Sequence, residues 1–125
     1  MTLLFGACNI KEGEKIFIKL KPEESGIHFS NRITENDTMN IISFEYVYNG
    51  GGVALGDFNN DNKVDIYFTG NQVENKLYLN QGLSDSRIVK FKDVTQKANV
   101  GGQGKWCTGV SVVDINNDGL LDIYA

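Results

Sequence analysis

The chain has 125 residues, with sixteen acidic and twelve basic side chains and a net charge of −4. An acidic pI of about 4.9 and the lack of any Lys/Arg cluster argue against a nucleic-acid partner, for which a basic patch is expected. The single His28 and the separated Cys8 and Cys107 do not form a zinc-binding spacing. Nucleic-acid binding and soft-metal chemistry are therefore excluded.

The N-terminal segment, residues 1–8, is similar to the end of a lipoprotein signal, with small residues before a cysteine that would be lipidated. Phe5 departs from the usual Leu, and the apolar stretch is shorter than the roughly 7–15 residues of a full signal. A short buried segment is the alternative. No transmembrane span is predicted, so a lipid on Cys8 would be the only membrane attachment. We expect an exported protein, either anchored at the outer membrane or cell surface or extracellular.

Residues 9–48 are expected to supply outer or closing strands. Residues 27–29 are predicted to pair as the outer strand of a neighbouring unit. Residues 41–48 alternate apolar and polar side chains, which predicts a strand with one apolar face. That face would consist of Ile42, Phe44, Tyr46 and Tyr48.

Short strands with turn signals between them follow. Residues 52–56 are predicted to form a strand of small residues suited to a crowded interior. β-branched and aromatic residues between turn signals predict strands at residues 64–69, 76–80 and 88–95. Turns are predicted at 69–71 and 80–82. A helical turn near residues 95–99 is the only helical candidate. Cys107, beside Trp106, is interpreted as a small buried hydrophobe; a bond to Cys8 would be lost if Cys8 carries a lipid.

Two nine-residue stretches, 57–65 and 114–122, carry the strongest chemical signal. Each places an oxygen-bearing side chain at positions 1, 3, 5 and 9, and both continue into Ile-Tyr, so that seven of eleven residues are identical. Side chains at positions 1, 3 and 5 of a tight loop converge on one point, as in sites that enclose a hard cation. The carbonyl of position 7 would add a ligand. The predicted ligands are Asp57, Asn59, Asp61, Lys63 and Asp65 in the first loop and Asp114, Asn116, Asp118, Leu120 and Asp122 in the second.

Ca²⁺, about one ion per loop, is the cation that these donors predict, because it accepts about 6–8 oxygen ligands in irregular geometry. Position 6 must let the chain reverse with φ > 0, which Gly119 does freely and Asn62 less freely. The alternative is that both loops are ordinary Asp/Asn turns without metal. An EF-hand is excluded because its twelfth position requires Glu, where these loops have Phe68 and Ala125.

The two loops lie 57 residues apart (114 − 57), a period typical of repeat architectures. Four antiparallel strands per period correspond to one blade of a β-propeller, with the cation loop joining the first two strands. The predicted fold is all-β: two four-stranded antiparallel blades, the N-terminal fragment of a larger propeller. The first repeat would span residues 49–105, and residues 106–125 would begin the second.

Three stretches resemble a known family. They are residues 51–67 (GGVALGDFNNDNKVDIY), 75–80 (NKLYLN) and 91–95 (FKDVT), and they are similar to the FG-GAP/VCBS repeats of secreted β-propellers. Residues 25–29 (SGIHF) resemble the start of the ASPIC/UnbV-type branch. The resemblance implies a calcium-stabilised propeller related in architecture to the integrin α-subunit head. Asn59, Asn116 and Asn62 depart from the family pattern of Asp, Asp and Gly.

No catalytic constellation is visible, since His28 has no assignable partner and the close carboxylate pairs lie in the two loops. Three classes of function are compatible with the sequence. A binding or adhesion scaffold for a protein or glycan partner is favoured. The alternatives are a polysaccharide-active propeller enzyme, whose catalytic residues lie outside this chain, and a structural support for a C-terminal domain.

Overall fold

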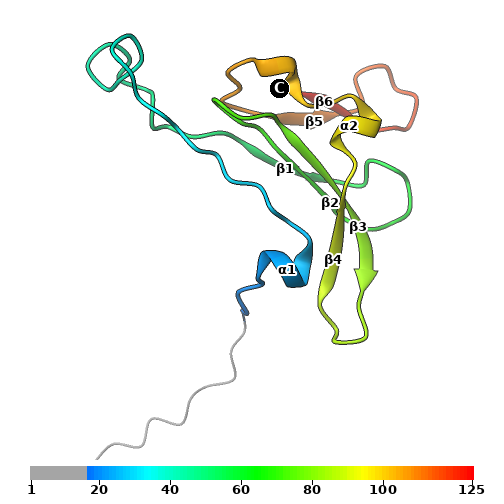
Figure 1. Cartoon of the computed structure of the whole chain (residues 1–125). Helices are drawn as coiled ribbons and strands as arrows, with labels where there is room; N and C mark the ends of the chain where they lie inside the picture. Colours follow the sequence, from blue (N-terminus) through cyan, green and yellow to red (C-terminus); the bar gives the residue numbers. More distant parts are fainter. Residues whose placement is uncertain (1–16) are drawn as a thin grey trace, which may run out of the picture.

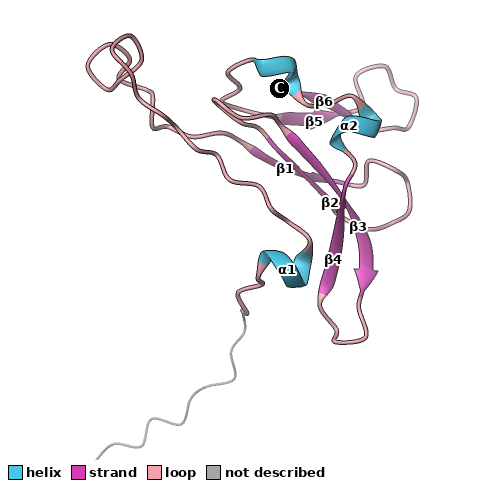
Figure 2. Cartoon of the chain, viewed as in Figure 1, coloured by secondary structure: helices cyan, strands magenta, loops and turns pink. Residues whose placement is uncertain are grey.

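The structure, a computed structural model, describes residues 17–125 and is built from two antiparallel sheets (Figures 1 and 2). The first sheet has the strand order β1-β2-β3-β4. Its strands are β1 (Val53–Gly56), β2 (Asp65–Phe68), β3 (Lys76–Leu83) and β4 (Val89–Asp93). All four lie where the sequence predicts strands, so the four-stranded blade is confirmed. The expected signal segment 1–8, with Cys8, falls outside the described residues.

The second sheet is a hairpin of β5 (Ser111–Val113) and β6 (Asp122–Tyr124). Its register copies that of the first hairpin. Ala54 faces Tyr67 in the first sheet, and Ser111 faces Tyr124 in the second, so both partners are shifted by the same 57 residues. The repeat predicted from the two loops therefore extends to the pairing of the strands on either side of them.

Helical structure is confined to short segments of the described chain. These are α1 (Pro22–Ser25), α2 (Thr95–Ala98) and the 3₁₀ turn η1 (Gly102–Gly104). The helix α2 confirms the turn predicted near residues 95–99, whereas α1 was not predicted. Its start is marked by Pro22 in the first turn and by the Glu24 carboxylate, which accepts the N–H of Lys21 at 3.1 Å. Within residues 17–125 no helix is both long and apolar enough to span a membrane.

The apolar core lies between the first sheet and the β5–β6 hairpin. Ala54, Tyr67 and Leu77 come from three neighbouring strands and are buried on one face of the first sheet. Val110, Val112 and Ile123 from the second repeat pack against them. The backbone just before β1 lies close to the residues just before β5. A Cβ placed on Gly52 would lie 3.0 Å from Val110 Cγ1. A glycine at this point lets adjacent repeats pack against each other.

The strand predicted at residues 41–48 is wrong, because this segment forms successive turns that project away from both sheets (Figure 1). The Asn40 side-chain oxygen accepts the N–H groups of Ile42 and Ser43 at 3.0 and 3.1 Å. Side-chain bonds of this kind compete with strand pairing. Of the predicted apolar face, Ile42, Tyr46 and Tyr48 are exposed, and Phe44 packs edge-on against Trp106 at a ring distance of 5.6 Å.

The outer strand predicted at residues 27–29 is also wrong, because this segment lies across a face of the first sheet instead of pairing with an edge. The Phe29 ring stacks on Phe68 at 4.8 Å, and the His28 N–H donates to the Tyr78 hydroxyl at 3.3 Å. Aromatic burial therefore replaces strand pairing here.

The turn predicted at residues 80–82 is a β-bulge inside β3. The pairing with β4 shifts between Asn80 and Leu83, and Gly82 has a φ of +83°. The hairpin continues to a turn at residues 84–88, where Ser84 and Ile88 are bonded. The glycine that signalled a turn in the sequence therefore marks an extra residue in a longer strand.

Candidate metal centre

Both predicted cation loops connect paired strands. The first loop joins β1 to β2, and the second joins β5 to β6. They project from the same side of the structure in Figure 1, since β5 lies next to β1. The antiparallel pairing of each hairpin brings the first and last positions of its loop together.

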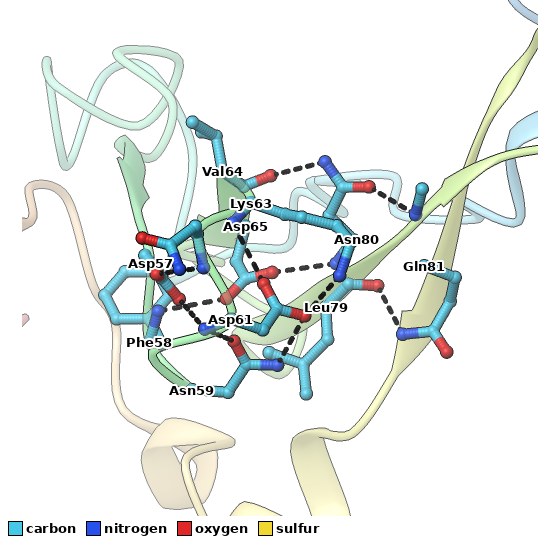
Figure 3. Close-up of polar contacts among 12 residues, drawn as sticks. Asp57, Phe58, Asn59, Asp61, Lys63, Val64, Asp65, Leu79, Asn80 and Gln81 are labelled. Atoms are coloured by element: carbon cyan, nitrogen blue, oxygen red, sulfur yellow. Dashed lines mark hydrogen bonds and ion pairs between the residues drawn. The ribbon is translucent and has the colours of Figure 1, made fainter.

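Hydrogen bonds from side chains to the backbone close the first loop (Figure 3). Asp57 Oδ1 accepts the N–H of Asp61 at 3.0 Å, and Asp57 Oδ2 accepts the N–H of Asn62 at 2.7 Å. Asn59 Oδ1 accepts the N–H of Asp61 at 3.2 Å. The oxygens at positions 1 and 3 therefore meet at the backbone amide of position 5. The convergence of all three side-chain oxygens on one cation stays a prediction.

Two residues of each loop have positive φ. At position 6, Asn62 has a φ of +63° and Gly119 a φ of +85°, as the sequence predicts. Position 4 is left-handed as well, with a φ of +58° at Asn60 and +59° at Asn117, and this was not predicted. Asn is one of the few non-glycine residues that adopt this region readily, which explains why both loops have Asn at position 4.

The second loop repeats the bonds by which the side chains at positions 1 and 3 of the first loop accept backbone N–H groups. Asp114 Oδ1 accepts the N–H of Asp118 at 3.0 Å, and Asp114 Oδ2 accepts the N–H of Gly119 at 2.8 Å. Asn116 Oδ1 accepts the N–H of Asp118 at 3.1 Å. The loop conformation is therefore a local consequence of the residues at positions 1, 3, 5 and 6.

The closing carboxylates lie in different surroundings. Asp65 is fully buried and accepts two backbone N–H groups, from Phe58 at 3.0 Å and from Asn80 at 2.7 Å. Asp122 is half-buried and accepts the N–H of Ile115 at 3.0 Å. The additional donor in the first loop comes from β3, which lies next to β2.

The residue that sequence reasoning missed is Asn80. Its backbone N–H binds Asp65, and its side chain donates to the Val64 carbonyl at 3.0 Å and accepts from Gly82 at 2.8 Å (Figure 3). Asn80 therefore links the end of the first loop to the bulge of β3. Its place at the end of the NKLYLN stretch was the available signal.

The first loop also contains an ion pair. Lys63 Nζ lies 2.9 Å from Asp61 Oδ2. The bond from the Lys63 ammonium lowers the pKa of Asp61 from its ordinary value, against the opposing effect of burial and with help from the Asn59 amide. Leu120 occupies the corresponding position of the second loop and carries no charge.

The donor set in each loop fits a hard cation, because it consists of carboxylate and amide oxygens. Each Asp57 oxygen accepts one N–H, and a carboxylate has about four lone-pair sites in all, so sites remain for a metal. The acidic side chains do not suffice alone: among residues 17–125 no three His, Cys, Asp or Glu side chains gather into a group that could hold a metal ion. The Asn oxygens and the position-7 carbonyls are needed, and the complete ligand set stays a prediction.

A second polar cluster lies between the two sheets and has a structural role. The Tyr67 hydroxyl donates to the Val100 carbonyl at 2.7 Å and accepts from the Asn75 side chain at 3.0 Å. Asn75 Oδ1 accepts the N–H of Gly70 at 2.8 Å. Burial raises the pKa of Tyr67, so this hydroxyl stays protonated at neutral pH. Cys107 beside it is buried, as its interpretation as a small hydrophobe requires.

Comparison with known proteins assigns the repeat to a family. No match is found among curated proteins or among solved structures. Residues 57–125 match the FG-GAP-like repeat, and this span contains both loops and five of the six strands. The match covers more than half of the 125-residue chain and begins at the first residue of the first loop. Together with the repeated register and the shared side-chain-to-backbone bonds of the two loops, this match shows that the chain belongs to the FG-GAP-like repeat family.

Proposed function

We propose that this chain is a calcium-binding repeat module of an exported propeller that serves as a scaffold for binding a protein or glycan. The observation that carries the calcium assignment is that two loops 57 residues apart share the same hydrogen bonds from backbone N–H groups to the side-chain oxygens of positions 1 and 3, which orients the same oxygens twice. Turns that serve only to reverse the chain do not require acidic side chains at three positions of both copies.

The residues that would hold the ion are the oxygen donors at positions 1, 3 and 5, the carbonyl at position 7 and the closing carboxylate. They are Asp57, Asn59, Asp61, Lys63 and Asp65, and Asp114, Asn116, Asp118, Leu120 and Asp122. A bound cation would offset the repulsion among three carboxylates in each loop and so stabilise the folded state. Ca²⁺ suits these donors better than Mg²⁺, which requires near-ideal octahedral geometry.

The calcium loops and the N-terminal sequence both support an exported protein. Loops of this kind in extracellular modules work at calcium concentrations of about 10⁻⁴–10⁻³ M, which an exported protein encounters. The small residues before Cys8 support attachment through a lipid, and residues 25–29 support a place in the ASPIC/UnbV-type branch. Calcium would stiffen the loops on one side of the blades, so that other surfaces of the propeller engage the partner.

The direct test is calcium titration into chelator-stripped protein by calorimetry, with thermal melting alongside. We expect about two sites and a rise in melting temperature with Ca²⁺ that is larger than with Mg²⁺. If the folded protein shows no heat of binding and no shift, the loops are turns and the proposed calcium function fails.

Asp114→Ala sharpens this test because Asp114 lies in an exposed loop and holds two loop amides. We expect one site to be lost and the melting temperature to fall more in calcium than in chelator. Asp85→Ala, at an exposed carboxylate outside both loops, is the matched control and leaves both sites intact. Equal losses in calcium and in chelator would identify Asp114 as a turn residue only.

A further inference from the structure

The two loops differ most in charge at position 7. Lys63 lies there in the first loop, and Leu120 in the second. Both loops use the backbone N–H of this residue alike, because it donates to the position-5 carboxylate at 2.9 Å from Lys63 and at 2.8 Å from Leu120. The two loops therefore differ at position 7 in the side chain and not in the backbone bond.

In the first loop the Lys63 side chain returns to the carboxylate at position 5. Asp61 Oδ2 accepts from Lys63 Nζ at 2.9 Å and from Asn59 Nδ2 at 3.2 Å (Figure 3). The stem of Lys63 passes close to the bulge of β3, since a Cβ placed on Gly82 would lie 3.7 Å from Lys63 Cε. The Lys63 ammonium therefore contacts Asp61, and its side-chain stem lies close to Gly82 of β3.

In the second loop the equivalent carboxylate has one side-chain donor. Asp118 Oδ2 accepts from Asn116 Nδ2 at 2.8 Å. Leu120 is exposed and contributes no positive charge. Within residues 17–125, the three carboxylates of this loop, at Asp114, Asp118 and Asp122, therefore have no lysine ammonium like that of the first loop.

We propose that Lys63 is a built-in counterion that competes with the bound cation for Asp61, so that the first loop depends less on calcium and binds it more weakly than the second. This inference rests on the proposed calcium function and deepens it, because it makes the two sites unequal in a defined order. The second loop would be the tight site, and the first would fill at higher calcium concentration.

The competition follows from charge. A divalent cation bound to Asp61 lies near the Lys63 ammonium, which must either move away or stay and repel it. The Lys63 and Asp61 side chains are 42% and 31% exposed, so solvent screens the repulsion and the effect is modest. We expect a weakening of about three- to tenfold in calcium affinity at the first loop.

Lys63→Met tests the proposal, because it removes the charge and keeps an unbranched stem. It is best measured in the Asp114→Ala background, in which the first loop is the remaining site. Calorimetry should show a dissociation constant that is about three- to tenfold lower than in the parent, with the difference shrinking as salt is added. Lys76→Met, which removes a lysine paired with Asp93 and Glu74 outside the loops, should leave the constant unchanged.

Leu120→Lys is the reciprocal change and should weaken calcium binding at the second loop of the otherwise native chain. A second readout comes from melting curves. Lys63→Met should lower the melting temperature in chelator and enlarge the rise that calcium produces, because the ammonium stabilises the loop when no metal is bound.

An unchanged calcium affinity in Lys63→Met, or a weaker one, would overturn the counterion role while leaving the calcium function intact. Absence of binding in the native chain would instead remove the calcium function, and this inference with it. The two failures are therefore distinguishable.

Discussion

The two loops share their hydrogen bonds from backbone N–H groups to side-chain oxygens but lie in different surroundings. In the first loop the closing Asp65 is fully buried and receives a second N–H from Asn80 of β3. In the second loop Asp122 belongs to a two-stranded sheet and is half-buried, with the N–H of Ile115 as its backbone partner. The shape of the loop is therefore set locally, whereas the burial of its last carboxylate depends on the neighbouring strand.

Replacement of the closing carboxylate should give the largest difference between the repeats. Asp65→Ala leaves two N–H groups without their acceptor at a buried site, which costs about 3 kcal/mol of the free energy of unfolding. Asp122→Ala removes one bond at a more exposed site and should cost about 1 kcal/mol. Urea unfolding in chelator measures both costs without a metal contribution. Equal costs would show that β3 does not anchor the first loop.

Substitutions at position 6 should change stability by an intermediate amount, and the change should differ between the two loops. Gly119→Ala places a Cβ at a φ of +85°, which costs roughly 1 kcal/mol in stability. Asn62→Gly relieves a smaller strain at a φ of +63° and should be neutral or slightly stabilising, with calcium binding at the first loop kept or strengthened. Melting curves and calorimetry on both variants test this order. A marked loss of binding in Asn62→Gly would contradict the left-handed role of Asn62.

The smallest change in stability should come from acidification, through Asp93 of the first sheet. Asp93 is partly buried, which raises its pKa, but bonds from Thr95 and Lys76 outweigh this and hold the pKa below its ordinary value of 3.8. Because the folded pKa is lowered, the stabilisation is complete above about pH 4 and is lost as the pH falls through the folded pKa. Asp93→Asn should therefore lose less stability than the native chain as the pH falls below about 4. Identical acid-unfolding profiles of Asp93→Asn and the native chain would show that the Asp93 carboxylate does not stabilise the fold in this way.

Most of the blade could be predicted because its signals are local. Strand β1 coincides with a run of small residues, and β2 and β4 coincide with short β-branched or aromatic runs between turn residues. The positive φ at Asn62 and Gly119 follows from the need to reverse the chain. The side chains at positions 1 and 3 of each loop bind backbone amides within five residues of themselves, so this part of the loop geometry could be predicted from spacing.

The mistaken strand at residues 41–48 has a physical cause. Its alternation was sufficient for a strand, but Asn40 caps the backbone of the next residues. A strand also requires a partner, and within residues 17–125 this segment pairs with no strand. Periodicity shows which residues would share a face, and it does not show whether another strand is available to pair with them.

The sequence by itself determined the repeat, the shape of the two loops and the strands beside them, because these depend on contacts between residues close together in the chain. Only the tertiary structure decided which closing carboxylate is fully buried, since the N–H of Asn80 reaches Asp65 across fifteen residues through strand pairing. It also decided that residues 27–29 cover an aromatic face and that the Lys63 stem lies by the bulge of β3. Such contacts join segments that are distant in the chain, so the spacing of neighbouring residues cannot predict them.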